Sequence, residues 1–347
     1  MRDKIVNGLK QYGSARFIIT LFLAVLLIVT YVLDLSFKAT VSDVLIRWCM
    51  NFVLVLAMVP SVLSGCGLNF GSTLGISCGL LGGVLAIEFG FNGFPSLIVA
   101  AVLGLLIAAA VGIIYGVLLN AVKGSEMMIA TYVGFAFVSL MCMVWIFLPI
   151  TNDALRLAMG GKGIRVNVEL SASFGHLLNE LWDVNVGGIT IPAGFMLVCA
   201  VFCVIVKLFL NSRTGRLMRT AGENPKFAET LHISENKNRV LGIMLSTMLS
   251  AVGILFYAQS YGFLQLYTAP LKMSFLAAAA ILIGGATTKK ASIINAVIGS
   301  FLFNGILATA TPVANALAPE SNLAEIVRII VSNGIIIYAL TKIRREV

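Results

Sequence analysis

The sequence predicts an all-α polytopic membrane protein with about ten transmembrane helices. Of its 347 residues, 59% are hydrophobic and 11% are charged, whereas an ordinary soluble domain carries roughly 25% charged residues. A soluble chain of this composition would lack the polar surface that keeps a protein in water. Apolar runs of about 20 residues, the length of a helix that crosses a bilayer, recur along the chain. We therefore expect residues 1–347 to form a single transmembrane domain.

Ten apolar runs predict the individual helices. Each has roughly the length of a bilayer span, although the eighth is short and the third follows directly on the second. A basic segment precedes the first run, but the apolar core is too long for a signal peptide, so we expect a retained helix. The predicted helices cover residues 17–37, 44–64, 70–90, 97–122, 127–148, 191–210, 240–260, 273–287, 291–311 and 325–341.

The distribution of basic residues predicts the orientation. If the N-terminus is cytoplasmic, ten helices place 17 of the 24 lysines and arginines inside and 7 outside, as the positive-inside rule requires. An odd number of helices would put one basic terminus on the wrong side. We therefore expect both termini in the cytoplasm, an external loop at 149–190 and a basic cytoplasmic loop at 211–239. The net charge of +9 then reflects topology and does not indicate nucleic-acid binding.

The sequence argues against several other functions. Aspartate, glutamate, lysine and arginine are nearly absent from the middle of the predicted helices, which disfavours a proton-coupled transporter or a voltage sensor. The chain contains no H-E-x-x-H, G-x-S-x-G or P-loop motif, so an intramembrane enzyme is disfavoured and ATP-driven work requires a separate subunit. The six cysteines lie in apolar stretches and the two histidines in different loops, so no metal site is expected.

Two regions, 64–73 and 270–285, interrupt the apolar pattern with glycine, proline and hydroxyl residues. Non-helical backbone at membrane depth must line a cavity or be buried in protein, so these regions predict a solute path. Close helix packing at the glycines is the alternative, and for Asn304 an interhelical hydrogen bond is the alternative to a ligand contact. Uncharged polar groups suit a neutral, hydroxyl-rich solute. The candidate path residues are Asn51, Ser64, Asn69, Ser72, Thr73, Ser274 and Asn304.

The basic loop contains a predicted short helix. Asn224 followed by Pro225 is typical of a helix start, with an N-cap side chain and then proline at the first helical position. Phe227, Ala228 and Leu231 would share one face of that helix. Such a short helix is not stable alone. It requires either a partner groove or the membrane surface.

In this loop the sequence resembles permease subunits of bacterial ABC importers, in the family that transports branched-chain amino acids, ribose, other simple sugars and nucleosides. Gly222, Asn224, Phe227, Ala228 and Ile233 match the family's coupling-helix motif, with Phe227 replacing an alanine. The Gly-Glu-Asn-Pro version is similar to the nucleoside branch. Residues 281–285 resemble the family's Leu-Gly-Gly segment, and 67–72 resemble its Asn-x-Gly segment. Ser274 stands where sugar permeases often carry an acidic residue.

This resemblance implies a type II ABC importer fold with two inverted-topology halves, located in the bacterial cytoplasmic (inner) membrane. It implies a second permease subunit, identical or paralogous, two ATPase subunits and an extracytoplasmic solute-binding protein, with membrane lipid around the helices. ATP and Mg²⁺ would bind the ATPases, and this chain would bind no cofactor. The residues implied to couple to the ATPase are Gly222, Glu223, Asn224, Pro225, Phe227, Ala228, Leu231 and Ile233.

Together these features predict a permease that imports a small neutral polar solute by alternating access. The sequence leaves the solute open among simple sugars, nucleosides and riboflavin-like compounds. An ATP-independent secondary transporter or facilitator is the alternative. The two differ in whether uptake depends on the 223–231 surface.

Overall fold

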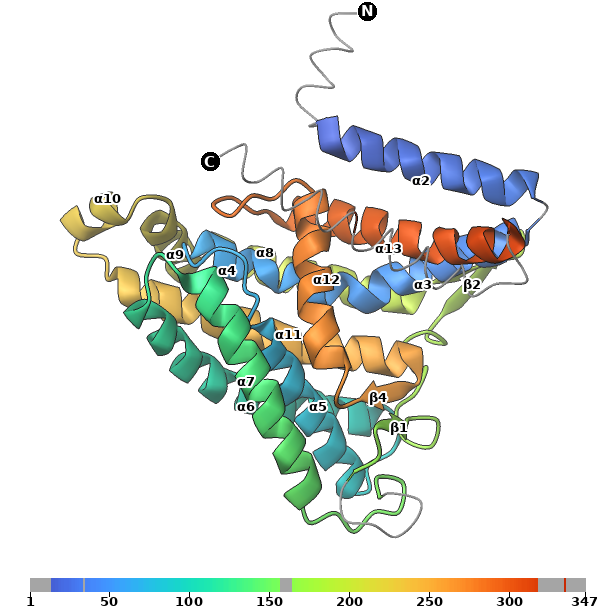
Figure 1. The fold of residues 1–347 in the computed structure, drawn as a ribbon, viewed down its shortest axis with the longest axis horizontal. Coiled ribbons are helices and arrows are strands. Elements are labelled where there is room, and N and C mark those ends of the chain that lie inside the picture. The colour runs from blue at the N-terminus through green and yellow to red at the C-terminus, as the bar shows by residue number, and fades with distance from the viewer. Residues whose placement is uncertain (1–13, 34, 157–163, 318–333, 335–347) are drawn as a thin grey trace, which may run out of the picture.

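The computed structural model describes residues 14–33, 35–156, 164–317 and 334. Long helices form most of it, and Figure 1 shows α9 and α10 at one end and the short strands at the opposite end. The first end carries the exposed side chains of Arg213, Arg216, Arg219 and Lys226 and is called the basic end. The end with the strands is called the sheet end.

Helices account for most of the described elements, and four short strands accompany them. The helices are α2 (Ser14–Val32), α3 (Phe37–Leu56), α4 (Met58–Leu63), α5 (Ser72–Glu88), α6 (Gly93–Ala121), α7 (Glu126–Phe147), α8 (Ala193–Asn211), α9 (Arg213–Glu223), α10 (Pro225–Thr230), α11 (Glu235–Tyr261), α12 (Ala269–Ile283) and α13 (Ile293–Leu317). The strands are β1 (Asn167–Glu169), β2 (Asp183–Val186), β3 (Ile189–Pro192) and β4 (Phe263–Gln265).

The structure supports a multi-pass membrane protein. Among the described residues, six helical segments are long and apolar enough to cross a membrane, and three shorter apolar helices accompany them. Nine of the ten predicted runs coincide with helices, and the tenth, 325–341, lies outside the described residues. The total of ten and the arrangement in two inverted halves stay predictions.

The predicted interruption of helical backbone at 64–73 is confirmed. The interruption predicted at 270–285 is wrong, because most of this region forms one helix. Pro60 lacks an N–H and its ring crowds the carbonyl of Leu56, so α3 ends at Leu56 and a separate turn, α4, follows before non-helical backbone at 65–71. In contrast, α12 is continuous because Pro270 lies in its first turn, where a missing N–H is tolerated. Gly284 and Gly285 end α12 instead of breaking it, with Gly285 at a φ of 81°.

Glycines bring α5 and α11 into backbone contact. A Cβ atom at Gly75 would lie 2.2 Å from the carbonyl oxygen of Thr247, and one at Gly79 would lie 2.2 Å from that of Ala251. The helices therefore approach more closely than any other residue would allow. Close helix packing is therefore the role of Gly75 and Gly79, which lie just after the 64–73 region.

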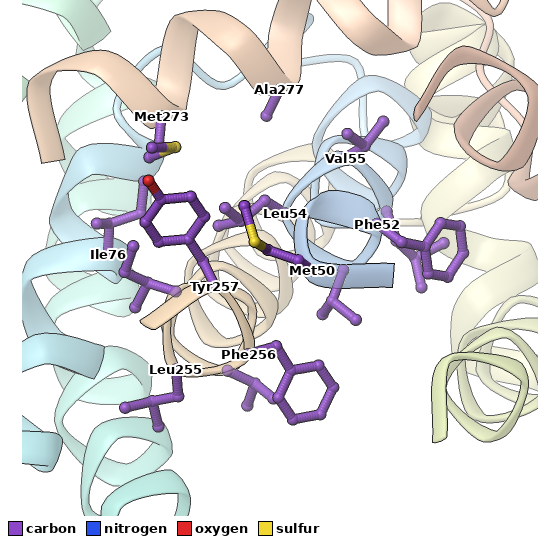
Figure 2. Packing of buried hydrophobic residues seen from close by; sticks show 14 of the residues in the cluster. Met50, Phe52, Leu54, Val55, Ile76, Leu255, Phe256, Tyr257, Met273 and Ala277 are labelled. Atoms are coloured by element: carbon purple, nitrogen blue, oxygen red, sulfur yellow. The ribbon is translucent and has the colours of Figure 1, made fainter. Parts of the chain in front are cut away.

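The core also joins α3, α11 and α12. Met50 of α3, Tyr257 of α11 and Met273 of α12 lie side by side, and in Figure 2 the Tyr257 hydroxyl points toward Met273. Tyr257 stacks on Tyr261 at the end of α11, with ring centroids 5.6 Å apart. Met50, Tyr257 and Met273 belong to one buried cluster, which joins α3, α11 and α12.

The expectation of an all-α chain is corrected by two small antiparallel sheets. Strand β1, from the predicted external loop, pairs with β4 so that Val168 lies opposite Leu264, and both side chains are fully buried. Strands β2 and β3 form a hairpin whose turn contains Gly187 and Gly188, both at positive φ. Such short strands are stable because they pack on the helices.

Candidate functional site

A cavity of about 110 Å³ lies between α3, α11, α12 and α13. Its wall is mostly apolar, with a few polar groups, which is the usual composition of a small-molecule site. The lining residues are Arg47, Met50, Asn51, Leu54, Val55, Tyr257, Met273, Leu276, Ala277, Ala280, Phe303, Asn304 and Leu307.

Asn51 and Asn304 are the uncharged amides in this wall. Asn51 Nδ2 donates to Asn304 Oδ1 at 2.9 Å, and Asn304 Nδ2 donates to the carbonyl of Ser300 at 2.8 Å. Both asparagines lie near the middle of their spans, Phe37–Leu63 and Ile293–Ala316. The interhelical hydrogen bond considered for Asn304 is therefore present, and the same pair also lines the cavity.

The charge of Arg47 in the cavity wall is partly balanced. Asp43, one helical turn earlier on α3, lies 3.8 Å from the Arg47 guanidinium, and both side chains are about half exposed. An exposed pair of this kind is weak, so it does not hold Arg47 rigidly. No carboxylate is among the residues that line the cavity.

Helix α12 lies between the cavity and a second set of polar residues, which includes Ser274. Met273 and Ala277 face the cavity (Figure 2). Ser274 points away from it: its hydroxyl donates to the carbonyl of Phe70 at 2.8 Å and accepts from Ser72 Oγ at 2.7 Å. Ser274 therefore ties α12 to the start of α5.

The remaining predicted path residues lie around the non-helical segment 65–71. Asn69 donates to Ser246 Oγ of α11 at 2.9 Å and accepts from the Tyr115 hydroxyl of α6 at 3.1 Å. Ser64 donates to the carbonyl of Ser61. Thr73 Oγ1 is buried and has no hydrogen-bond partner among the described residues. The seven predicted path residues thus form two groups, and only Asn51 and Asn304 line the cavity.

The predicted short helix is confirmed as α10. Asn224 caps it by accepting a hydrogen bond from the Phe227 backbone N–H at 3.1 Å, and Pro225 occupies its first turn. Ala228 is buried, whereas Phe227 and Leu231 are 52% and 53% exposed. Helix α10 therefore leaves two large apolar side chains in solvent at the basic end.

Helix α9, which the sequence analysis did not predict, carries α10. Ser212 caps its start by accepting from the Gly215 N–H at 3.2 Å. At its other end Gly222 lies against the α4–α5 connection: a Cβ there would be 2.2 Å from the carbonyl oxygen of Leu63 and 2.7 Å from the nitrogen of Gly65. Glu223 and Asn224 follow at once, so α10 is joined to the bundle through a glycine contact.

Sequence reasoning missed an ion pair beside this contact. Arg239 of α11 was taken as one of many basic loop residues, but its side chain is 6% exposed and its Nη2 lies 2.5 Å from Glu126 Oε1 at the start of α7. The sequence does place a glutamate at the start of both α7 and α11. It does not show that these two helix starts lie next to each other, so the ion pair could not be predicted from it.

Comparison with protein families identifies the chain. A family model described as the permease component of branched-chain amino acid transport systems matches residues 53–340. The chain belongs to this family. The match includes α5, α10 and three of the four cavity helices, α11, α12 and α13, whereas α2 and residues 37–52 of α3 precede it. No curated protein and no solved structure matches the chain.

The resemblance found in the sequence is thereby confirmed. The protein is a membrane permease subunit of an ABC transporter, a class in which the permease is not itself the enzyme. Membership implies partners such as an ATPase and a binding protein. The permease presents α10 at the basic end, and the cavity described above lies between its helices α3, α11, α12 and α13.

Proposed function

We propose that this permease imports a small neutral polar solute, a simple sugar or a nucleoside, into the bacterial cytoplasm by alternating access. The observation that carries the proposal is α10, a capped helix that presents Phe227 and Leu231 to solvent on a permease of the ABC class. An ATPase groove that covers these two side chains would remove the exposed apolar surface.

The orientation follows from charge. The basic end faces the cytoplasm, because positively charged loops stay on that side of the inner membrane. The sheet end then faces the solute-binding protein, and both termini lie in the cytoplasm. ATP and Mg²⁺ bind the ATPase subunits, and a second permease subunit completes the membrane part.

The cavity between α3, α11, α12 and α13 supports a neutral solute. Asn51 and Asn304 together offer amide donors and carbonyl acceptors, which suit hydroxyl groups or a nucleobase edge. The apolar wall suits a sugar face or a base. The cavity of about 110 Å³ is smaller than the roughly 300 Å³ of the smallest usual ligand pockets, so the helices must separate to admit a solute.

The decisive experiment extracts tagged permease gently from its own membrane and determines by mass spectrometry what co-purifies. An ATPase subunit in about equal amount supports the proposal. The extracted complex, reconstituted into vesicles, is then tested for uptake of labelled ribose and labelled uridine with and without ATP. Permease recovered alone, together with uptake that ignores ATP, contradicts the proposal and indicates an ATP-independent transporter.

A further inference from the structure

Arg239 joins three segments of the chain at the basic end. Besides the bond to Glu126, its Nε donates to Asn120 Oδ1 of α6 at 3.1 Å, and its Nη1 lies 3.5 Å from the carbonyl oxygen of Gly65. Glu235, one turn earlier on α11, lies 3.6 Å away. All three guanidinium nitrogens therefore face acceptors. A buried arginine is tolerated only under that condition.

The 65–69 segment is held at both of its ends by the same two helices. At Gly65 the contacts come from Arg239 of α11, which is itself bonded to α6. At Asn69 they come from Ser246, two turns further along α11, and from Tyr115 of α6. These hydrogen bonds attach the non-helical 65–69 segment to α6 and α11, and it is called the fastened segment below.

Helix α9 meets this fastened segment at one point. A Cβ at Gly65 would lie 3.0 Å from the Cα of Gly222, so the two backbones are in contact. Gly222 is separated from the first residue of α10 by only Glu223 and Asn224. A movement of α10 is therefore transmitted through Gly222 to the backbone at Gly65.

We propose that Arg239 and Glu126 are positioning residues for energy coupling. Glu126 holds the Arg239 side chain in place, and Arg239 in turn bonds to Gly65 and to Asn120. The 65–69 segment then moves together with α6 and α11 when Gly222 moves, instead of deforming. This inference rests on the proposed function, since coupling requires an ATPase that moves α10. A merely structural pair would stabilise the fold without changing the uptake obtained per ATP.

The test compares three variants of the reconstituted complex with the unaltered complex. Glu126→Gln keeps a hydrogen-bond acceptor but removes the charge, and Arg239→Lys keeps the charge but loses the planar fork that reaches several acceptors at once. Lys123→Gln is the matched control, because Lys123 forms an ion pair at the same end, 3.0 Å from Glu235, without touching Gly65. Phosphate release and uptake of labelled ribose and uridine are measured together.

We expect uptake per ATP hydrolysed to fall at least about fivefold in Glu126→Gln and in Arg239→Lys, the low end of usual coupling between sites. ATP hydrolysis itself should persist, and Lys123→Gln should keep the ratio of the unaltered complex. An unchanged ratio in both Glu126→Gln and Arg239→Lys overturns the inference. Absence of ATP-dependent uptake in the unaltered complex would instead contradict the proposed function.

A second measurement covers the case in which neither variant is recovered. Cys66, 4% exposed, lies within the fastened segment, and replacing the other five cysteines by serine makes it the single target of N-ethylmaleimide. If the segment moves with α6 and α11, Cys66 stays protected during ATP hydrolysis. Alkylation at least about fivefold faster during hydrolysis would show that the segment deforms, which overturns the inference.

Discussion

Asn51 on α3 and Asn304 on α13 are hydrogen-bonded across 2.9 Å, near the middle of two membrane-spanning helices. Both side chains line the cavity between α3, α11, α12 and α13. Because a hydrogen bond between two amides can be exchanged for a bond to a solute hydroxyl, we expect the pair to serve recognition as well as packing.

Replacing Asn304 by alanine should weaken solute binding. The change removes an acceptor for Asn51 and an amide from the cavity wall, and one lost hydrogen bond of about 1–1.5 kcal/mol corresponds to an increase in KM of roughly five- to tenfold. The concentration dependence of uptake measures this. Asn238→Ala is the matched control, because Asn238 bonds to the Ser234 carbonyl at the basic end. Equal KM values for all three forms would exclude a role of the pair in recognition.

Replacing Phe227 and Leu231 together by serine should release the ATPase. Both side chains are about half exposed, so burying their exposed halves at an interface contributes roughly 1.5–3 kcal/mol in total. We expect at least about a tenfold loss of co-purified ATPase with normal amounts of permease in the membrane. Full retention of the ATPase would show that α10 lies on the membrane surface instead.

Removing the cap of α10 should weaken the same association by less. Asn224→Ala deletes the acceptor for the Phe227 N–H, and the loss of such a cap costs about 0.5–2 kcal/mol. ATPase affinity should fall roughly two- to thirtyfold. Asn224→Ser restores an acceptor and should recover most of the affinity, whereas a serine variant as weak as the alanine variant would assign Asn224 a direct contact.

A methyl group at Gly79 should destabilise the bundle. Because the added Cβ would lie 2.2 Å from the Ala251 carbonyl oxygen, Gly79→Ala forces α5 and α11 apart, at about 1–3 kcal/mol. Thermal unfolding of the detergent-extracted protein measures the loss. The control is Gly83→Ala on the same helix, where the nearest atoms are flexible leucine side chains at 3.3 Å. Equal melting temperatures in both variants would refute the close contact.

The sequence predicted those features whose chemistry is local. Asn224 and Pro225 specify a helix start within two residues, and the structure has α10 at that place. Asn51 and Asn304 stood out because a polar side chain is conspicuous in an apolar run. Their pairing was not predictable, since 253 positions separate them along the chain.

Features that depend on which helices meet were missed. Arg239 and Glu126 are 113 positions apart, and each alone looks like an ordinary charge at a helix start. For Pro270 the error was one of interpretation, because proline near a polar stretch fits both a broken helix and the first turn of an intact one. The structure has the intact helix.

The backbone contact of Gly75 and Gly79 with α11 has a mechanical consequence. Helix α5 has no side chain at these two positions that a rotamer change could move aside. We therefore expect α5 and α11 to move as one rigid body, here called the beam. Helix α11, with 27 residues, is about 40 Å long at 1.5 Å per residue. A tilt of about 5° at its basic end therefore sweeps the far tip through roughly 3.5 Å, which makes the beam a lever that enlarges a small movement of α10.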